Sequence, residues 1–148
     1  MIGKNVIGRE YPEFSYEVEK VKIREFANAI GDKNPVYYDE KAANEEGFKG
    51  LALPPSFPIV FSLAGGLMTV VLEDLKVDLV KALHGGQQYE YFKPVKPGDI
   101  VTGKIRIADV FEKTGKAGTM DFIIIETTYT NQNGEKVLVD TNTLIQRR

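Results

Sequence analysis

Hydrophobic and polar residues alternate along the C-terminal half of the chain. Residues 100–111 place apolar or small side chains on one face and polar ones on the other, which is typical of a half-buried antiparallel strand. The inward face holds Val101, Gly103, Ile105 and Ile107. We expect further strands at residues 87–92, 119–130 and 136–145, with a hairpin loop at 113–118. Asn133-Gly134 is a strong hairpin-turn signal, because both residues tolerate a positive φ.

The N-terminal half instead shows helical spacing. A short strand is expected at Phe14–Val18, followed by a helix over Glu19–Ile30 whose apolar residues share one face. Gly31 is placed to end that helix, as glycine just past a C-terminus commonly does. Asp39 can cap a second helix that runs through Glu46 and closes at Gly47.

A third helix is predicted over residues 58–75, with Ser56 as its N-cap and Pro58 in its first turn. It is apolar nearly all round, so it must be enclosed by the rest of the fold. Its apolar part, Ile59–Leu72, is shorter than the roughly 20 residues that cross a bilayer. The pair Gly65-Gly66 costs about 1 kcal/mol of helix stability per glycine, so we expect the sheet to approach closely there. The pattern predicts an α+β fold, with the sheet curled over one buried helix.

Composition and charge narrow the classes of function. A chain of 148 residues fits one domain, expected over 1–148. Its net charge of −2, with basic residues dispersed, gives no case for a nucleic-acid or anionic-membrane surface. The absence of cysteine excludes disulfides and thiolate ligands, and a single histidine excludes a multi-histidine metal site. The N-terminus has no apolar signal region, so a cytoplasmic protein is expected. We also expect no metal and no cofactor.

Two segments resemble a known family. Residues 31–39 read G-D-K-N-P-V-Y-Y-D, followed by Ala43 and Gly47-Phe48. MaoC-like hydratases and dehydratases carry D-x-N-P-x-H-x-D, an alanine and then G-F before the buried helix of their hot-dog fold. Residues 83–99, L-H-G-G-Q-Q-Y-E-Y-F-K-P-V-K-P-G-D, are similar to the next strand and turn of that family. In order and spacing, the resemblance covers nearly the whole chain.

The resemblance implies a hot-dog fold, a curved antiparallel sheet around one long buried helix, that dimerises through edge strands. It implies an acyl-thioester tunnel between subunits. It also implies reversible hydration of a trans-2-enoyl thioester, carried on CoA or acyl carrier protein, to the (R)-3-hydroxyacyl form. Adding water requires an acid and a base, which the motif aspartate and histidine supply in that family. An N–H group at the start of the buried helix polarises the thioester carbonyl.

Three residues are candidates for catalysis: Asp32, Tyr37 and His84. Asp32 matches the motif aspartate, but Tyr37 stands where the family has histidine. Tyrosine, with a pKa of about 10, is a poor base, although it can hold a water or a carbonyl by hydrogen bond. His84 is the one histidine and a candidate substitute base. The structural alternatives are a turn role for Asp32 and a strand-end role for His84.

Four residues are candidates for substrate binding: Asn34, Pro55, Ser56 and Phe57. Pro55 aligns with the position that donates the N–H group in the family, and proline has none to donate. Ser56 or Phe57 could donate instead. Asn34 and Pro35 also have a structural reading, because Pro35 forces Asn34 away from helical geometry.

The departures favour an auxiliary role. Some dehydratases of this family pair two unlike hot-dog subunits or halves, one of which keeps the Asp-His pair while the other shapes the acyl site. We expect this chain to be the second type, although a homodimer with altered chemistry stays open. The alternative is a binding module that holds an acyl-CoA or fatty acyl chain without turnover. A thioesterase is disfavoured, because that chemistry usually needs an acidic residue on the buried helix, and residues 59–72 contain none.

Overall fold

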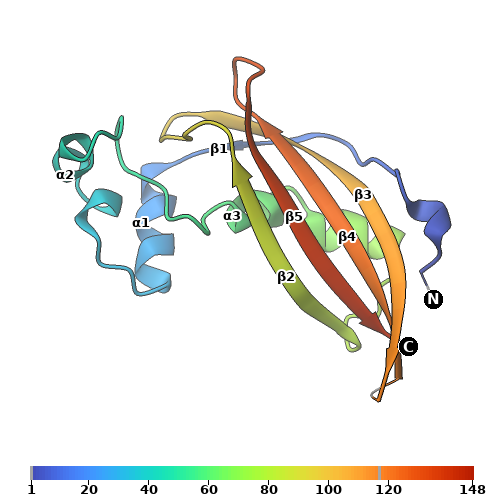
Figure 1. Cartoon of the computed structure of the whole chain (residues 1–148). Helices are drawn as coiled ribbons and strands as arrows, with labels where there is room; N and C mark the ends of the chain where they lie inside the picture. The colour runs from blue at the N-terminus through green and yellow to red at the C-terminus, as the bar shows by residue number, and fades with distance from the viewer. Residues whose placement is uncertain (1, 117) are drawn as a thin grey trace.

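Five antiparallel strands form one curved sheet in the computed structural model, which describes residues 2–116 and 118–148 (Figure 1). The strands lie in the order β1-β3-β4-β5-β2. Their bounds are β1 Phe14–Glu17, β2 Ala82–Tyr91, β3 Ile100–Gly115, β4 Gly118–Thr130 and β5 Lys136–Arg147. The sheet curves around a helical segment between β1 and β2 in the sequence. The predicted α+β hot-dog architecture is confirmed.

The alternation in β3 is confirmed, since Val101, Gly103, Ile105 and Ile107 are all buried. The hairpin between β3 and β4 is tighter than predicted, because pairing continues to Gly115 opposite Gly118. The prediction for the Asn133-Gly134 turn is partly wrong, because only Gly134 has a positive φ, of 74°. The loop between β4 and β5 is longer than two residues, and the Asn131 side chain closes it by accepting the N–H groups of Asn133 and Glu135.

The central helix is broken, so the prediction of one helix over residues 58–75 is wrong. It consists of α3 (Ile59–Ala64), the π-helical turn η3 (Leu67–Val71) and α4 (Leu72–Asp74). The break lies at Gly65-Gly66, where Gly66 has a left-handed φ of 78°. Ser56 does not cap this helix, because Pro58 occupies the N-cap position and makes no side-chain cap bond. Phe57 N–H donates to the Pro54 carbonyl instead, in a turn that precedes the helix.

The expected close approach to the glycine pair is confirmed, and Phe14 of β1 makes it. A Cβ atom on Gly65 would overlap the Phe14 ring, and so would a Cβ atom on Gly103 of β3. The ring is therefore wedged between the helix break and the sheet, at a spacing that only glycine permits on either side.

Two short helices stand together beyond one end of the sheet (Figure 1). They are α1 (Lys20–Ala29) and α2 (Glu40–Glu45), with the 3-10 turn η2 (Pro35–Tyr37) between them and η1 (Lys4–Val6) near the N-terminus. Asp39 caps α2 as predicted, because its carboxylate accepts the Lys41 N–H at 2.9 Å. Gly31 and Gly47 take φ values of 76° and 91° at the ends of these helices.

The core divides into two apolar clusters. The first joins α1 and η2 to α3 through Phe57, Phe61 and Tyr129, and the second lies under α4 against the middle of β3 and β4. Phe14 packs against both clusters. Among the described residues, no helix has the length and hydropathy needed to cross a membrane.

Candidate functional site

Residues 31–38 form what we call the motif loop. Its polar side chains form hydrogen bonds with the backbone of the loop itself. Asp32 Oδ1 accepts the Asn34 N–H at 3.0 Å, and Asn34 Oδ1 accepts the Val36 N–H at 3.2 Å. Tyr38 donates its hydroxyl to the Asp32 carbonyl oxygen at 2.6 Å. These bonds show the turn role foreseen for Asp32, and they fix the loop that presents Tyr37.

Tyr37 is buried at the base of the motif loop. Burial raises the pKa of its phenol, and the nearby charge of Asp32 raises it further. A raised pKa keeps the hydroxyl protonated at neutral pH, so Tyr37 is a hydrogen-bond donor rather than a base. Asn34, Tyr37 and Pro55 line one cavity of about 570 Å³ together with Phe48 and Leu53. The structure thus brings three of the predicted site residues together.

Pro55, Ser56 and Phe57 make different contacts at the start of the buried helix. The Pro55 carbonyl accepts the Tyr91 hydroxyl at 2.5 Å, which ties this segment to β2. Phe57 N–H donates to the Pro54 carbonyl at 2.8 Å, and the Phe57 ring lies fully buried in the core. Within the described residues, the N–H group of Ser56 has no acceptor. Of the two N–H donors considered from the sequence, Ser56 is therefore the free one.

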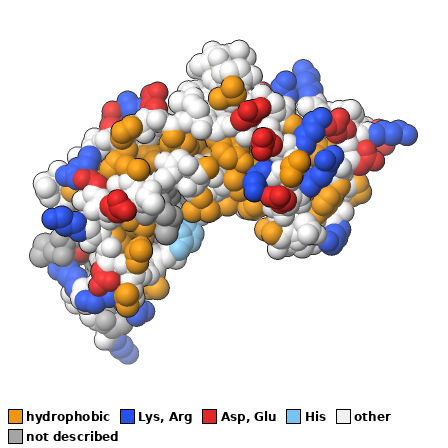
Figure 2. Space-filling view, turned by 180° about the vertical axis from the view of Figure 1, so that it is seen from behind, with side chains coloured by type: hydrophobic (Ala, Val, Ile, Leu, Met, Phe, Trp, Pro, Cys, Tyr) orange, Lys and Arg blue, Asp and Glu red, His pale blue; other side chains and the backbone are white. Residues whose placement is uncertain are grey.

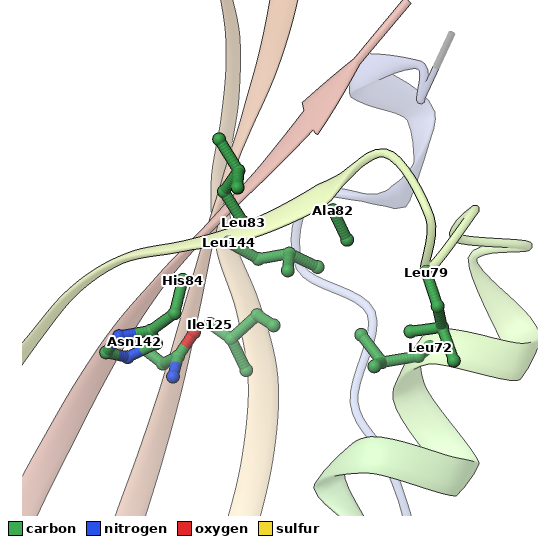
Figure 3. A pocket seen from close by; sticks show the side chains of 8 residues that line it. All are labelled: Leu72, Leu79, Ala82, Leu83, His84, Ile125, Asn142 and Leu144. Carbon is green, nitrogen blue, oxygen red and sulfur yellow. The ribbon is translucent and has the colours of Figure 1, made fainter.

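His84 lies elsewhere, on the inner face of β2. It lines a pocket of about 340 Å³ together with Asn142, and the rest of the lining is apolar, mainly Leu72, Leu79, Ile125 and Leu144. Figure 3 shows His84 and Asn142 side by side at one end of this pocket, with Leu72 and Leu79 toward the other. The cavity beside the motif loop shares none of these lining residues. The structure therefore does not place His84 in one cavity with Asn34, Tyr37 and Pro55.

A buried carboxylate, Asp140 of β5, lies behind His84. It is 1% exposed and accepts hydrogen bonds from the Ser62 hydroxyl, at 2.8 Å, and from the Gln87 amide. The Ser62 oxygen also lies 2.9 Å from the Tyr129 hydroxyl. Since the single Ser62 proton goes to Asp140, Tyr129 is the donor in that pair. The carboxylate thus joins the central helix to β2 and β5.

The hydrogen bonds continue outward from Gln87 to the pocket. Gln87 Oε1 accepts the Asn142 amide at 2.7 Å and lies 3.0 Å from His84 Nε2. Together these side chains form what we call the polar network: Ser62, Gln87, His84, Tyr129, Asp140 and Asn142.

Burial raises the pKa of Asp140 to about 6, although its bonds from Ser62 and Gln87 and the nearby His84 oppose the shift. Of the polar network, only His84 is a candidate site residue from the sequence alone. Asp140 and Asn142 lie at inward-facing positions of β5, where the alternating pattern predicts apolar residues. Polar residues at these positions are the sequence signal that indicates a buried polar site.

One edge of the sheet is open at β2, because β5 is the one strand paired to it among the described residues. Leu83 and Tyr91 of this strand, and Phe92 just after it, are more than 40% exposed, at 43%, 48% and 44%. Figure 2 shows hydrophobic side chains gathered along the middle of one face of the molecule, with charged side chains more frequent toward its ends.

The curved sheet, the enclosed helix and the motif loop beside its start define a hot-dog dehydratase fold. The family model described as "FAS1-like, dehydratase domain region" matches residues 5–139, and the chain belongs to this family. It is 36% identical to a UPF0336 protein of Thermobifida fusca, over 99% of this chain and 94% of that one.

Solved structures agree on the fold. The truncated HadBC complex of Mycobacterium tuberculosis, a 3R-hydroxyacyl-ACP dehydratase, is similar with a TM-score of 0.79 and 26% identity, over 95% of this chain and 96% of that one. The MaoC-like dehydratase of Rhodospirillum rubrum has a TM-score of 0.71 and 21% identity, over 96% and 92% of the two chains. The resemblance to MaoC-like proteins is confirmed, and at least one neighbour works within a complex.

Proposed function

We propose that this chain is a subunit of an (R)-specific 3-hydroxyacyl-thioester dehydratase, or enoyl-thioester hydratase, and that a second hot-dog subunit supplies the catalytic Asp-His pair. One observation carries the proposal: the motif loop holds the buried Tyr37 where the family has its catalytic histidine. Asp32 accepts the N–H of its own turn, and Tyr37 is a buried, protonated phenol. A proton must be removed and another delivered in this reaction, and a neutral phenol does neither well.

The same loop remains suited to binding. Tyr37 offers a hydroxyl donor at a cavity of about 570 Å³, and Ser56 offers a free N–H next to Pro55 in the cavity wall. Each of these donors would bind the thioester carbonyl oxygen of an acyl-CoA or acyl carrier protein substrate. The chain therefore contributes carbonyl binding, and the partner contributes proton transfer.

The open edge of β2 supports pairing with that partner. An unpaired strand edge offers a row of backbone donors and acceptors to another strand. Leu83, Tyr91 and Phe92 add apolar area there, and no lysine or proline lies within β2 itself to block pairing. The partner is a hot-dog subunit with an intact D-x-N-P-x-H motif.

The test is hydration of crotonyl-CoA and of a longer enoyl-CoA, followed by loss of enoyl-thioester absorbance. We expect no turnover from this chain alone and turnover when the partner is added. Tyr37→His restores the motif histidine, and Tyr37→Phe is the matched control without a base or a hydroxyl. Hydration by the wild-type chain alone would contradict the auxiliary role, and Asp32→Ala would then show whether Asp32 takes part.

The second candidate is a binding module that holds an acyl chain without turnover. The apolar pocket of about 340 Å³ favours it, because such a pocket can take an alkyl chain whether or not chemistry follows. Binding of decanoyl-CoA, combined with no turnover after any intact partner is added, would select this function over the first.

A further inference from the structure

The cavity beside the motif loop adjoins a second cavity, of about 380 Å³. Phe48 lines both cavities and is 45% exposed. The second cavity is lined by residues from three loops, which lie after α2, after β2 and between β4 and β5: 47–51, 93–99 and 131–135. Because the two cavities share a wall residue, one ligand can extend from the first into the second past Phe48.

Three lysines line the second cavity, which we call the lysine cavity: Lys49, Lys93 and Lys96. Lys93 is ion-paired with Glu135. Lys49 and Lys96 are exposed, and neither forms an ion pair within the part of the chain that the structure describes. Two ammonium groups at this cavity are therefore available to a ligand.

The carboxylates that line the lysine cavity already have partners. Asp99 is 5% exposed and accepts the Lys96 N–H and the Gln132 amide, both at 3.0 Å. Glu135 is occupied by its ion pair with Lys93. The ammonium groups of Lys49 and Lys96 are thus the uncompensated charges, and an ammonium group is a common partner of phosphate in proteins.

The cavity beside the motif loop has the opposite charge. Glu45 and Glu46 line it, and no lysine or arginine is among its described lining residues. Like charges repel, so a phosphate group is disfavoured there and favoured in the lysine cavity. A ligand that spans both cavities should therefore have a neutral part near the motif loop and an anionic end beyond Phe48.

The carrier of an acyl thioester has this arrangement. CoA and acyl carrier protein both hold the acyl group on a 4′-phosphopantetheine arm, a long uncharged chain with two amide groups that ends in a phosphate. The proposed function places the thioester carbonyl at Tyr37 and Ser56, beside the motif loop. The uncharged arm would then lead away from the carbonyl and pass the apolar ring of Phe48.

We propose that Lys49 and Lys96 bind the phosphate of the 4′-phosphopantetheine arm in the lysine cavity. The inference rests on the proposed function, which supplies the thioester and its position. It adds a second point of attachment for the substrate, remote from the reacting carbons.

The first experiment compares decanoyl-4′-phosphopantetheine with decanoyl-pantetheine, which differ only in the phosphate, by calorimetry. We expect the phosphorylated thioester to bind about fivefold more tightly, the effect of two exposed charge pairs. Added salt should reduce this preference, because it screens exposed charges. The double variant Lys49→Met and Lys96→Met, which keeps the apolar stems, should abolish it. Lys4→Met is the matched control, since Lys4 is an exposed lysine of η1 outside both cavities.

A second comparison distinguishes the two sources of the phosphate. Tighter binding of decanoyl-CoA than of decanoyl-4′-phosphopantetheine identifies CoA as the carrier, because only the nucleotide differs. Equal affinity of these two, with tighter binding of a decanoyl acyl carrier protein, identifies the carrier protein. Both results support the phosphate site if the double lysine variant weakens the binding.

The outcomes separate this site from the proposed function. Equal binding of the two pantetheine thioesters, or a preference that survives the double lysine variant, overturns the phosphate site and leaves the proposed function standing. The same holds if Lys4→Met reduces the preference as much as the double variant does. A preference that the double variant alone removes, without dehydration in the presence of any intact partner, supports the site and refutes the proposed function.

Discussion

The motif loop and the polar network contain the same kinds of side chain, but they use them differently. In the loop, Asp32 and Asn34 each bond a backbone N–H two residues ahead. In the network, Asp140 bonds side chains that lie 78 and 53 residues away in the sequence. Local bonds build a turn, whereas long-range bonds join side chains from distant parts of the sequence beside a pocket. The comparison teaches that the same kinds of polar side chain can stabilise a local turn in one region and join distant strands in another.

The largest expected effect comes from removing the apolar support next to the motif loop. Phe57 is fully buried, with ring centroids 5.4 Å from Phe26 and 5.6 Å from Phe61. Phe57→Ala should lower the free energy of unfolding by about 3–5 kcal/mol, measured by urea denaturation. Phe92→Ala, at an exposed ring over which Lys136 lies, is the control and should cost less than about 1 kcal/mol. Similar losses for both would contradict a core role for Phe57.

The second prediction uses the buried charge of the network. Because burial raises the pKa of Asp140 to about 6, from about 3.9 in an unfolded chain, the folded state binds more protons between these values. This group therefore makes the protein less stable as the pH rises from about 4 to 6, by on the order of 2 kcal/mol. Asp140→Asn carries no charge, so the variant should gain stability relative to wild type over that window. A difference in unfolding free energy that stays constant from pH 4 to pH 7 would contradict the shift.

A smaller effect is expected from the loop carboxylate. Asp32→Ala removes one exposed turn bond, so the free energy of unfolding should fall by about 1 kcal/mol. The ¹⁵N signals of His84 should not move, because no bond joins Asp32 to the polar network in the described structure. A changed tautomer in Asp32→Ala would show that the loop and the network are coupled, against the separation described above.

The smallest effect is expected at Ser56. Its side chain does not cap α3, so Ser56→Ala should change the free energy of unfolding by less than about 0.5 kcal/mol. Loss of a real N-cap serine costs typically about 1 kcal/mol. Thermal unfolding of this variant beside wild type separates the two cases, and a drop of that size would restore the capping role predicted from the sequence.

Much of the fold could be predicted because its signals are local. The alternation of β3, the Asp39 cap and the glycines after α1 and α2 each depend on residues within one element. The helix break was not predicted, because Gly65-Gly66 lies in a long and largely apolar run, and the Phe14 ring that packs against Gly65 is 51 positions away in the sequence. The turn at Asn133-Gly134 differed because the side chain of Asn131 closes a longer loop.

The site was predictable to the extent that it follows a motif. Asn34, Tyr37 and Pro55 do line one cavity. The free N–H group at the start of the helix could not be identified from the sequence. It depends on a turn in which Phe57 N–H bonds to the Pro54 carbonyl, and the hydrophobic pattern of the chain does not reveal that turn. The environment of Asp140 depends on the sheet register, which places Gln87 opposite Asn142. It also depends on the burial of Ser62, which is fully buried in the fold.

The packing of the Phe14 ring between Gly65 and Gly103 also restricts the order in which these positions can change over evolution. Gly65 and Gly103 are each held small by the same ring, although they belong to different elements. If either glycine is replaced by a larger residue first, the new side chain clashes with the Phe14 ring. If Phe14 is first replaced by a smaller residue, space opens at both glycines. The three positions should therefore covary among relatives, and a phenylalanine at position 14 should exclude a side chain at either glycine position.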